Sequence, residues 1–265
     1  MCTLAVFRNV STAWPLLVAA NRDEFFGRAS APPSRSSELL LAGRDLVAGG
    51  TWLGCRTDGS GRVAALLNRR PSPDLPATGP GARSRGLLCL EALEAPTIGS
   101  TVAALDGEAV ALYGGFNLFL ADLREALVVD NGSGGEPRTQ ALADGLSVLT
   151  NLDVNDPRCA RQRGAAQGFS ALVPKLRGGL VLHEAVDLLA AVLAGHDPGP
   201  DAAGDGREAL DRVCVHTPGY GTRSATLLFV DAAGGVRCFH ADGAPCRTPF
   251  REVPQPGLGD MGEGS

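Results

Sequence analysis

Short apolar segments occur in pairs along the chain, each pair adjoining a polar turn. Residues 3–9 and 16–21 form the first pair, on either side of a Ser-Thr turn, and this pattern predicts a β-hairpin. Two more hairpins are predicted where Asp-Gly and Asn-Gly turns adjoin apolar runs. The strands predicted beyond the first pair are 49–54, 63–67, 115–121, 125–130, 147–150, 213–216, 222–230 and 236–240.

Helical periodicity is confined to a few segments. Apolar positions spaced for one helix face predict helices over 84–93, 158–172 and 183–195. Strands outnumber helices and come as hairpins, with one central helical block between them. This order favours a single α+β domain over residues 1–250, built from stacked, mainly antiparallel sheets with helices packed outside.

Several segments carry the composition of loops. Residues 29–46 are rich in Ser, Pro and Arg, and residues 71–81 are rich in Pro, so both are predicted to be loops. Residues 197–206 have turn composition and are predicted to form a mobile loop. Residues 251–265 are rich in Gly and Pro, and we expect a flexible tail there.

The overall composition narrows the class of protein. The 265 residues are 44% hydrophobic and 20% charged, with a net charge of −5. A net negative charge argues against a nucleic-acid or anionic-membrane surface as partner. The N-terminus lacks the order of a signal peptide, and no apolar run reaches the roughly 18 residues of a membrane span. We therefore expect a soluble, cytoplasmic protein without a membrane span.

The cysteine pattern gives no sign of a cofactor. The seven cysteines are scattered and form no Cys-x-x-Cys pair, which predicts neither a zinc site nor a disulfide framework. They are expected to be mostly reduced, buried thiols. Since a Gly-rich phosphate loop and a Ser/His/Asp signature are also missing from the sequence, we predict no metal and no cofactor.

The first candidate for chemistry is Cys2, directly behind Met1. Removal of Met1 is chemically plausible because cysteine is small, and it would give Cys2 a thiol and a free α-amine. The thiol pKa is ordinarily ~8.5 and the amine pKa ~8, so both titrate near neutrality. The amine can then take the thiol proton without a histidine. Alternatively, Cys2 is a small apolar residue that opens a buried strand, and a retained Met1 would favour that interpretation.

A polar sequence, Asn-Arg-Asp-Glu at 21–24, ends the second predicted strand. It could be the solvated mouth of a loop. It could also place Arg22 and Asp23 beside the strand that begins at Cys2, where an Arg/Asp pair could orient the amine and lower the thiol pKa. Asn68 similarly ends a predicted strand, either as a turn residue or as an amide donor that points into a site.

Four motifs together resemble a known family. They are AANRDEFFGR (19–28), GGTWLG (49–54), GFNLFLADL (115–123) and PGYGTRSATLLFVD (218–231). They resemble the NRDE family, also called the transport-and-Golgi-organisation-2 family, and extend from residue 1 to about residue 240. Such families resemble the N-terminal-nucleophile (Ntn) hydrolases. The resemblance therefore implies a four-layer αββα sandwich.

A second, more remote resemblance concerns mechanism. The choloylglycine hydrolase and penicillin V acylase group begins with Met-Cys-Thr, as here, and uses the processed cysteine as nucleophile. By this resemblance Cys2 is the nucleophile, and Asp23 falls on the aspartate that holds the cysteine amine. The group's arginine position holds Ala20, while Arg22 lies two residues later. Either a bulge restores the arginine or its role is altered.

The same group has a Leu-Asn and a Thr-Asn at strand ends, which Leu67-Asn68 and Thr150-Asn151 match. The resemblance implies that Asn68 and Asn151 supply the oxyanion hole and support the nucleophile, a type of donor worth ~3 kcal/mol in the transition state. Its late arginine corresponds to Arg223. Predicted substrate-binding residues are Asn21, Arg22, Glu24, Trp52 and Asn117.

Two functions remain open at this stage. The first is an Ntn-type cysteine hydrolase or acyltransferase that acts on a small-molecule amide or thioester through an acyl-Cys2 intermediate. The second is a carrier of haem, lipid or acyl-CoA, which are ligands connected with the NRDE family. In such a carrier, Cys2 would either bind the ligand or only line the pocket. Histidines 183, 196, 216 and 240 could ligate haem in principle, but the sequence has no Cys-x-x-Cys-His attachment motif. A purely structural role would not explain the polar residues 21–24.

Overall fold

The computed structural model describes residues 2–37, 39–70, 82–132, 136–197 and 208–254. Within these residues the chain forms two antiparallel sheets of seven strands each. The predicted loops 71–81 and 197–206 fall almost entirely outside the described residues, as does most of the predicted tail.

The first sheet contains the N-terminal hairpin and the C-terminal strands. Its spatial order is β10 (Gly145–Leu149), β1 (Thr3–Arg8), β2 (Leu16–Phe25), β12 (Tyr220–Val230), β13 (Val236–Ala241) and β14 (Arg251–Glu252), with β11 (His216–Thr217) paired to β12. β14 occupies the start of the predicted tail. The central β1–β2–β12 trio places the two ends of the domain side by side.

The second sheet is formed by the middle of the chain in sequence order. It consists of β3 (Ser30–Ser37), β4 (Leu40–Asp45), β5 (Leu53–Arg56), β6 (Val63–Asn68), β7 (Phe116–Ala121), β8 (Ala126–Asp130) and β9 (Arg138–Ala141). Strands that follow one another in the chain pair with one another throughout, so this half of the fold has the order of a meander, although residues 69–115 separate β6 from β7.

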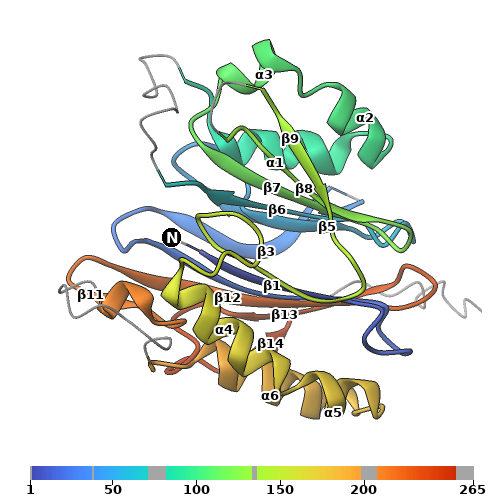
Figure 1. The fold of residues 1–265 in the computed structure, drawn as a ribbon, viewed down its shortest axis with the longest axis vertical. Helices are drawn as coiled ribbons and strands as arrows, with labels where there is room; N and C mark the ends of the chain where they lie inside the picture. The colour runs from blue at the N-terminus through green and yellow to red at the C-terminus, as the bar shows by residue number, and fades with distance from the viewer. Residues whose placement is uncertain (1, 38, 71–81, 133–135, 198–207, 255–265) are drawn as a thin grey trace, which may run out of the picture.

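Helices cover the outer face of each sheet (Figure 1). α1 (Arg85–Glu94), α2 (Ile98–Ala103) and α3 (Gly107–Ala111) cover the second sheet, whereas α4 (Ala160–Ser170), α5 (Val173–Arg177) and α6 (Leu182–Leu193) cover the first. A 3-10 turn, η1 (Glu208–Asp211), precedes β11. The fold is an αββα sandwich, as the family resemblance implied.

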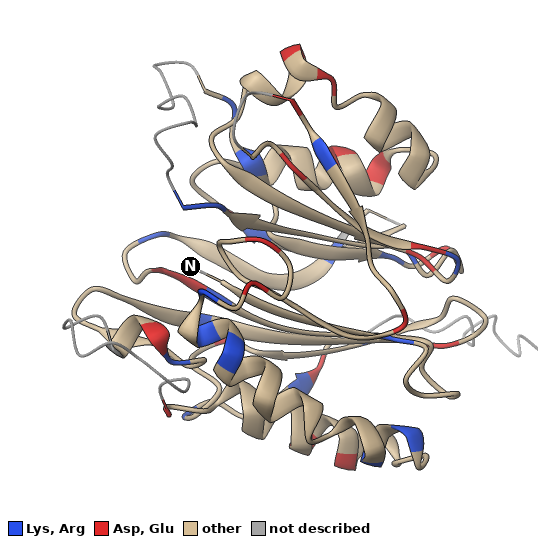
Figure 2. Cartoon of the chain, in the orientation of Figure 1, with Lys and Arg blue, Asp and Glu red and all other residues tan. Residues whose placement is uncertain are grey.

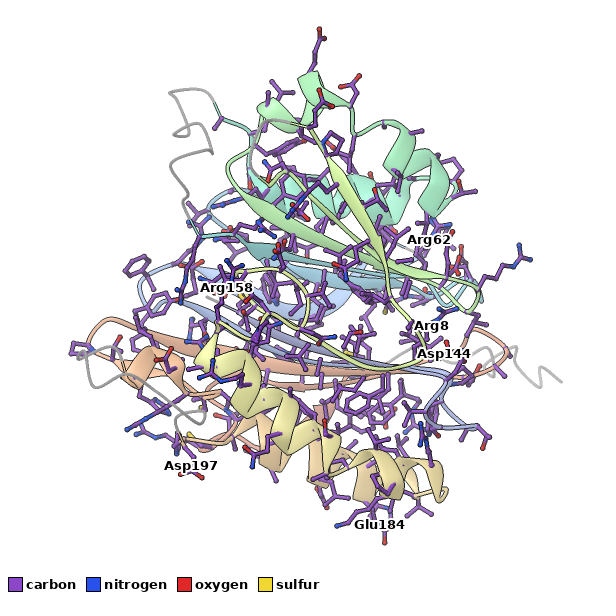
Figure 3. The ribbon with its side chains drawn as sticks, in the orientation of Figure 1. Arg8, Arg62, Asp144, Arg158, Glu184 and Asp197 are labelled. Carbon is purple, nitrogen blue, oxygen red and sulfur yellow. The ribbon has the colours of Figure 1, made fainter. Side chains whose placement is uncertain are left out.

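Alternation along the strands divides the core into three layers. In β1, Leu4 and Val6 pack between the two sheets, while Ala5 and Phe7 pack against the helices on the other face. Successive strand side chains point to opposite faces, so one continuous apolar segment supplies both layers. Side chains fill the space between the layers (Figure 3).

The prediction of a loop over 29–46 is wrong, because β3 and β4 lie there. β3 is an edge strand, and its pairing with β4 shifts register between Ala31 and Ser34, where the two prolines stand. An edge position with a bulge tolerates residues that lack a backbone donor. The short elements α2, α3 and β9 were also not predicted, whereas α1, α4 and α6 lie within two residues of the predicted helices.

The surface carries both signs of charge. Basic and acidic residues are interspersed over the helices and strand ends in the view of Figure 2. Within the part of the chain that the structure describes, no helix has the length and apolar character needed to cross a bilayer.

Candidate active site

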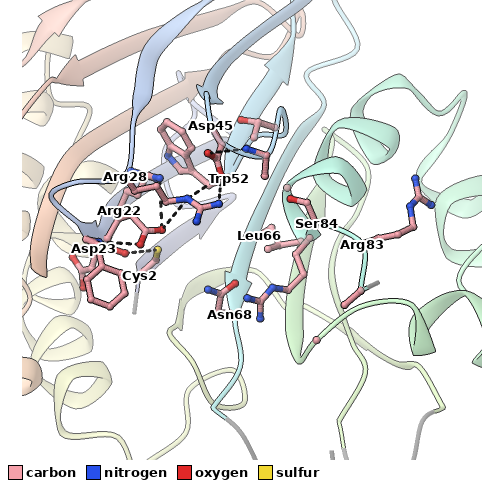
Figure 4. A pocket seen from close by; sticks show the side chains of 18 residues that line it. Cys2, Arg22, Asp23, Arg28, Asp45, Trp52, Leu66, Asn68, Arg83 and Ser84 are labelled. Atoms are coloured by element: carbon pink, nitrogen blue, oxygen red, sulfur yellow. Dashed lines mark hydrogen bonds and ion pairs between the residues drawn. The ribbon is translucent and has the colours of Figure 1, made fainter. Parts of the chain in front are cut away.

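Cys2 lies at the mouth of a cavity of about 480 Å³ between the two sheets. The C-terminal ends of β2 and β6 and the N-terminus of α1 form its walls (Figure 4). The residues that line it are Cys2, Arg22, Asp23, Glu24, Phe25, Arg28, Asp45, Ala48, Thr51, Trp52, Leu66, Asn68, Ala82, Arg83, Ser84, Arg85, Gly86 and Gly114. Of the ten predicted site residues, six therefore meet at one cavity: Cys2, Arg22, Asp23, Glu24, Trp52 and Asn68.

Strand register places Arg22 beside Cys2. Thr3 pairs with Asn21 across β1 and β2, so continuing the register puts Cys2 opposite Arg22. Ala20 and Arg22 are two residues apart and share one face of β2, the face that packs between the sheets. Arg22 therefore points to the same side of β2 as Ala20, which holds the arginine position of the choloylglycine hydrolase group. No bulge in β2 is needed for this. The bulge lies in β12 instead, between residues 222 and 224.

Arg22 is held by an aromatic ring and a carboxylate. Its guanidinium carbon lies 4.3 Å from the centroid of the Trp52 ring, a cation–π distance. Its Nη2 is 3.7 Å from Glu24 Oε2, and its side chain is only 5% exposed. Burial lowers the pKa of Arg22, and the neighbouring Glu24 opposes this change. The site therefore keeps a cation near the sulfur.

Asp23 forms a different ion pair from the one expected. Its Oδ2 lies 2.5 Å from Arg161 Nη1, with side chains 0% and 2% exposed, and its Oδ1 accepts from Thr222 Oγ1 at 2.7 Å. Burial raises the pKa of Asp23, and Arg161 opposes the rise. The expected Arg22–Asp23 pair is thus replaced by Arg22–Glu24 and Asp23–Arg161.

Arg161 was not predicted from the sequence, although the spacing of apolar residues in α4 indicates that it is buried. Arg161, Ala165 and Phe169 are spaced by four residues and are all buried. An arginine in register with two core residues on a helix face is buried itself and requires a buried partner.

The environment of the Cys2 thiol raises its pKa. Burial raises the pKa of Cys2, the charge of Asp23 adds to the rise, and Arg22 opposes it. The Cys2 sulfur lies 4.0 Å from the main-chain oxygen of Asp23. The expectation that Arg22 and Asp23 together lower the thiol pKa is therefore wrong, because burial outweighs the arginine.

Two of the predicted asparagines lie beside the cavity rather than in it. Asn117 is fully buried and donates to the main-chain oxygens of Thr150 and Leu152 at 3.2 and 2.8 Å. It thereby fixes the turn that contains Asn151. Asn151 is buried, and its main-chain oxygen accepts from Arg70 N at 2.9 Å. This bond ties the turn to the segment just after β6.

The structure separates two predicted residues from the cavity. Asn21 donates to the main-chain oxygens of Leu193 and Val213 at 2.8 and 2.9 Å, so it anchors the helical layer. Arg223 lies at the bulge of β12, and its buried Nε has no hydrogen-bond partner among the described residues. The further cations that line the cavity are Arg28, Arg83 and Arg85.

The GGTWLG motif joins the second sheet to α1. A Cβ atom on Gly50 would lie 2.1 Å from the carbonyl carbon of Gly86, and Thr51 N donates to Gly86 O at 3.0 Å. Only a residue without a side chain permits this approach. The contact brings the start of α1, with Arg85, to the cavity wall.

Charge in the cavity is only partly balanced. Arg28 binds Asp45 at 2.6 Å and lies 3.7 Å from Glu24. Arg85 instead donates to the main-chain oxygen of Gly115 at 2.9 Å. Burial, together with the charge of Arg28, lowers the pKa of Arg85. This combination favours a ligand that brings a negative group.

Metal-type ligands gather elsewhere in the described chain. His196, Cys214, His216 and Cys246 place their ligand atoms within 4.8 Å of one another. None of these residues lines the cavity that contains Cys2.

The fold and sequence both have known counterparts. A solved structure of the Caenorhabditis elegans N-acylethanolamine-hydrolyzing acid amidase ortholog, an Ntn hydrolase, superposes with a TM-score of 0.54 at 13% identity and covers 96% of this chain and 100% of that one. The Transport and Golgi organization protein 2 homologs of Bos taurus and Homo sapiens are each 32% identical over 248 residues, covering 84% of this chain and 85% of theirs. The family model described as Transport and Golgi organisation 2 matches residues 1–242. The chain therefore belongs to the Transport and Golgi organisation 2 family.

Proposed function

We propose that this protein is an Ntn-type cysteine hydrolase or acyltransferase that cleaves an amide or thioester through an acyl-Cys2 intermediate. The observation that supports this most is the position of the Cys2 sulfur. It lines a cavity of about 480 Å³ on a hydrolase-like fold. Removal of Met1 would make Cys2 the N-terminal residue. An N-terminal thiol at the wall of a cavity is the arrangement that such chemistry needs.

The proposed reaction begins with removal of Met1. The freed α-amine of Cys2 takes the thiol proton, and the sulfur attacks the substrate carbonyl carbon. The amine then returns the proton to the leaving amine or thiol as the carbon–nitrogen or carbon–sulfur bond breaks. Water, or an acceptor amine, attacks the acyl-cysteine and restores the thiol. The raised thiol pKa fits this route, since the proton moves only when base and substrate are in place.

The other proposed roles follow from position. Asp23, buried and held by Arg161 and Thr222, orients the α-amine. Asn68 enters the cavity from the opposite sheet (Figure 4) and is the proposed oxyanion donor. Asn151, in the turn beside the cavity, is proposed to support Asn68. Arg223 has no proposed contact with substrate.

The substrate is proposed to carry a negative group. Arg85 lines the cavity and donates to a main-chain carbonyl. Because that acceptor is neutral, the bond does not balance the positive charge of Arg85. Arg22 and Trp52 line the cavity together with Cys2, and Glu24 lies 3.7 Å from the Arg22 guanidinium. An acyl or leaving group with a carboxylate or phosphate would meet these arginines.

The test combines intact mass with turnover. We expect the natively purified protein to be lighter than the encoded chain by one methionine and to cleave members of an amide and thioester panel. Cys2→Ala is expected to abolish turnover, whereas Cys2→Ser is expected to retain a small fraction of the wild-type turnover. Exposed His183 offers a matched control, since His183→Ala is expected to keep full turnover. Retained Met1, or turnover in Cys2→Ala, would refute the proposal.

The alternative is a non-catalytic carrier of haem, lipid or acyl-CoA. The observation in its favour is the burial that raises the pKa of the Cys2 thiol, which leaves less of the nucleophilic thiolate. All four histidines lie in the described part of the chain, and none lines the cavity. A haem ligand from the cavity lining would therefore be Cys2, which would lose its proton on binding because cysteine ligates haem iron as the thiolate. A Soret shift on haem titration that Cys2→Ala removes, in a protein without turnover, would favour the carrier.

A further inference from the structure

A second group of reactive side chains lies outside the cavity. Cys214 Sγ is 3.7 Å from Cys246 Sγ, and His216 Nε2 lies 3.5 Å from Cys214 Sγ and 3.2 Å from Cys246 Sγ. His196 completes the group, with its ring centroid 5.1 Å from that of His216. We propose that these four residues bind a structural Zn²⁺ ion.

The separations match tetrahedral zinc. Zinc–sulfur bonds of about 2.3 Å and zinc–nitrogen bonds of about 2.05 Å at tetrahedral angles place two sulfurs about 3.8 Å apart and a sulfur and a nitrogen about 3.6 Å apart. The sulfur pair, at 3.7 Å, and one sulfur–nitrogen pair, at 3.5 Å, agree with these values. All four ligand atoms lie within 4.8 Å of one another. His196, which is exposed, is the outer ligand.

The donor set also selects the ion. Two thiolates cancel the charge of a divalent cation, so the site needs no carboxylate. A closed set of two cysteines and two histidines is a common structural zinc site. Sulfur and imidazole together disfavour the hard ions Mg²⁺ and Ca²⁺.

Three distant segments of the backbone hold the ligands in place. Cys214 N donates to Gly195 O at 2.8 Å, which ties the start of this segment to the end of α6 beside His196. Cys246 lies in a turn that is closed by Thr248 N donating to Ala244 O at 3.0 Å. Cys214 is fully buried, and His216 and Cys246 are half-buried. The ion would therefore link the end of α6, β11 and the chain after β13.

The proposed metal site is connected to Asp23. Val215, between two of the ligands, donates through its main-chain N to Thr222 Oγ1 at 2.8 Å. Thr222 Oγ1 in turn donates to Asp23 Oδ1 at 2.7 Å. Zinc would thus hold the segment that orients the buried carboxylate, although no ligand enters the cavity.

The test measures metal content in the full chain, purified under reducing conditions without chelator. We expect about one zinc ion per chain, and loss of most of it in Cys214→Ser and Cys246→Ser. Cys2→Ser and His183→Ala are matched controls outside the group and should keep the zinc. Cobalt added to the apoprotein should give the visible ligand-field bands of a tetrahedral site and sulfur-to-cobalt charge transfer. Both signals should weaken in His216→Ala.

Stability gives a second measurement that does not depend on the variants folding. Chelation of the wild-type protein should lower its Tm, and zinc should restore it but not magnesium. Zinc that is absent and cannot be restored under reducing conditions would overturn the proposal. So would zinc retained at full stoichiometry in a folded Cys214→Ser protein, or a Cys214–Cys246 disulfide in the protein as purified from cells.

Discussion

The buried Asp23–Arg161 pair allows a quantitative prediction. Replacing Arg161 with Met removes the cation and keeps much of the volume, so Asp23 loses its charged partner in a site where both side chains are at most 2% exposed. Removing one member of a buried pair costs about 3–5 kcal/mol. Arg161 Nε also donates to Leu210 O at 2.7 Å, so a main-chain oxygen loses its partner as well. We expect Arg161→Met to lower the free energy of unfolding by about 4 kcal/mol at pH 7.5.

The loss should depend on pH. Burial already raises the pKa of Asp23, and Arg161 opposes that rise, so removing Arg161 raises the pKa further. A carboxyl whose folded pKa exceeds its unfolded pKa destabilises the fold above the unfolded pKa, and the penalty is relieved as pH falls through the folded value. The difference between variant and wild type should therefore shrink from pH 7.5 to pH 5.

Urea denaturation provides the assay. With a slope of roughly 2–3 kcal/mol per M for a chain of this size, the expected loss lowers the midpoint by about 1–2 M. Asp23→Asn combined with Arg161→Met should recover part of the loss, because both charges are gone. Arg177→Met changes an exposed arginine on the neighbouring α5 and should stay within about 0.5 kcal/mol of wild type. A loss in Arg161→Met below about 1 kcal/mol, or one equal at both pH values, would refute this account.

Three further predictions concern positions around the site. Asn117→Ala leaves the buried carbonyl of Thr150 and the half-buried carbonyl of Leu152 without this donor. It should cost about 3 kcal/mol in urea denaturation, and a loss below about 1 kcal/mol would contradict the assigned role. Burial lowers the pKa of His240 to about 4, so unfolded chains take up a proton first on acidification and stability should fall by up to ~3 kcal/mol between about pH 6.5 and 4. His240→Gln should remove most of that pH dependence, and an unchanged pH profile would argue against it. Gly50→Ala should lower the free energy of unfolding by at least about 2 kcal/mol, because its Cβ would meet the Gly86 backbone. Gly27→Ala, with open space around its Cβ, should be nearly neutral. Thermal melts of the two variants would provide the comparison.

The sequence by itself determined most strands, the main helices and the cavity residues nearest Cys2. Alternation of apolar and polar positions is a local property, and the Asp58-Gly59 pair correctly marks the turn between β5 and β6. The turn between β7 and β8 lies at Asp122–Glu125 and not at the predicted Asn131-Gly132. Cys2 and residues 21–24 were recognisable because polar groups at the end of an apolar strand are unusual. The four-layer order came from the family resemblance, since strand patterns do not state how two sheets stack.

The tertiary structure decided which charges pair. Asp23 and Arg161 are separated by 138 residues, and no local pattern links a strand end to the first turn of a distant helix. Arg22 and Asp23 are adjacent on β2 and face opposite sides of the sheet, so the expected pair did not form and Arg22 lies beside Glu24 instead. Burial of the sulfur then outweighed the charge of Arg22, a balance that depends on packing and not on residue spacing.

The tertiary structure also decided where strands and ligands end up. β3 exists because β4 offers it an edge on which two prolines are tolerated. The Cys and His residues proposed to bind zinc come from three chain segments, so the absence of a Cys-x-x-Cys pair carried no information about them. Asn21 and Asp23 are two residues apart and share the face of β2 that points to the helical layer, where Asn21 anchors main-chain oxygens and Asp23 pairs with Arg161. Arg22 lies between them and points to the opposite face, toward Trp52.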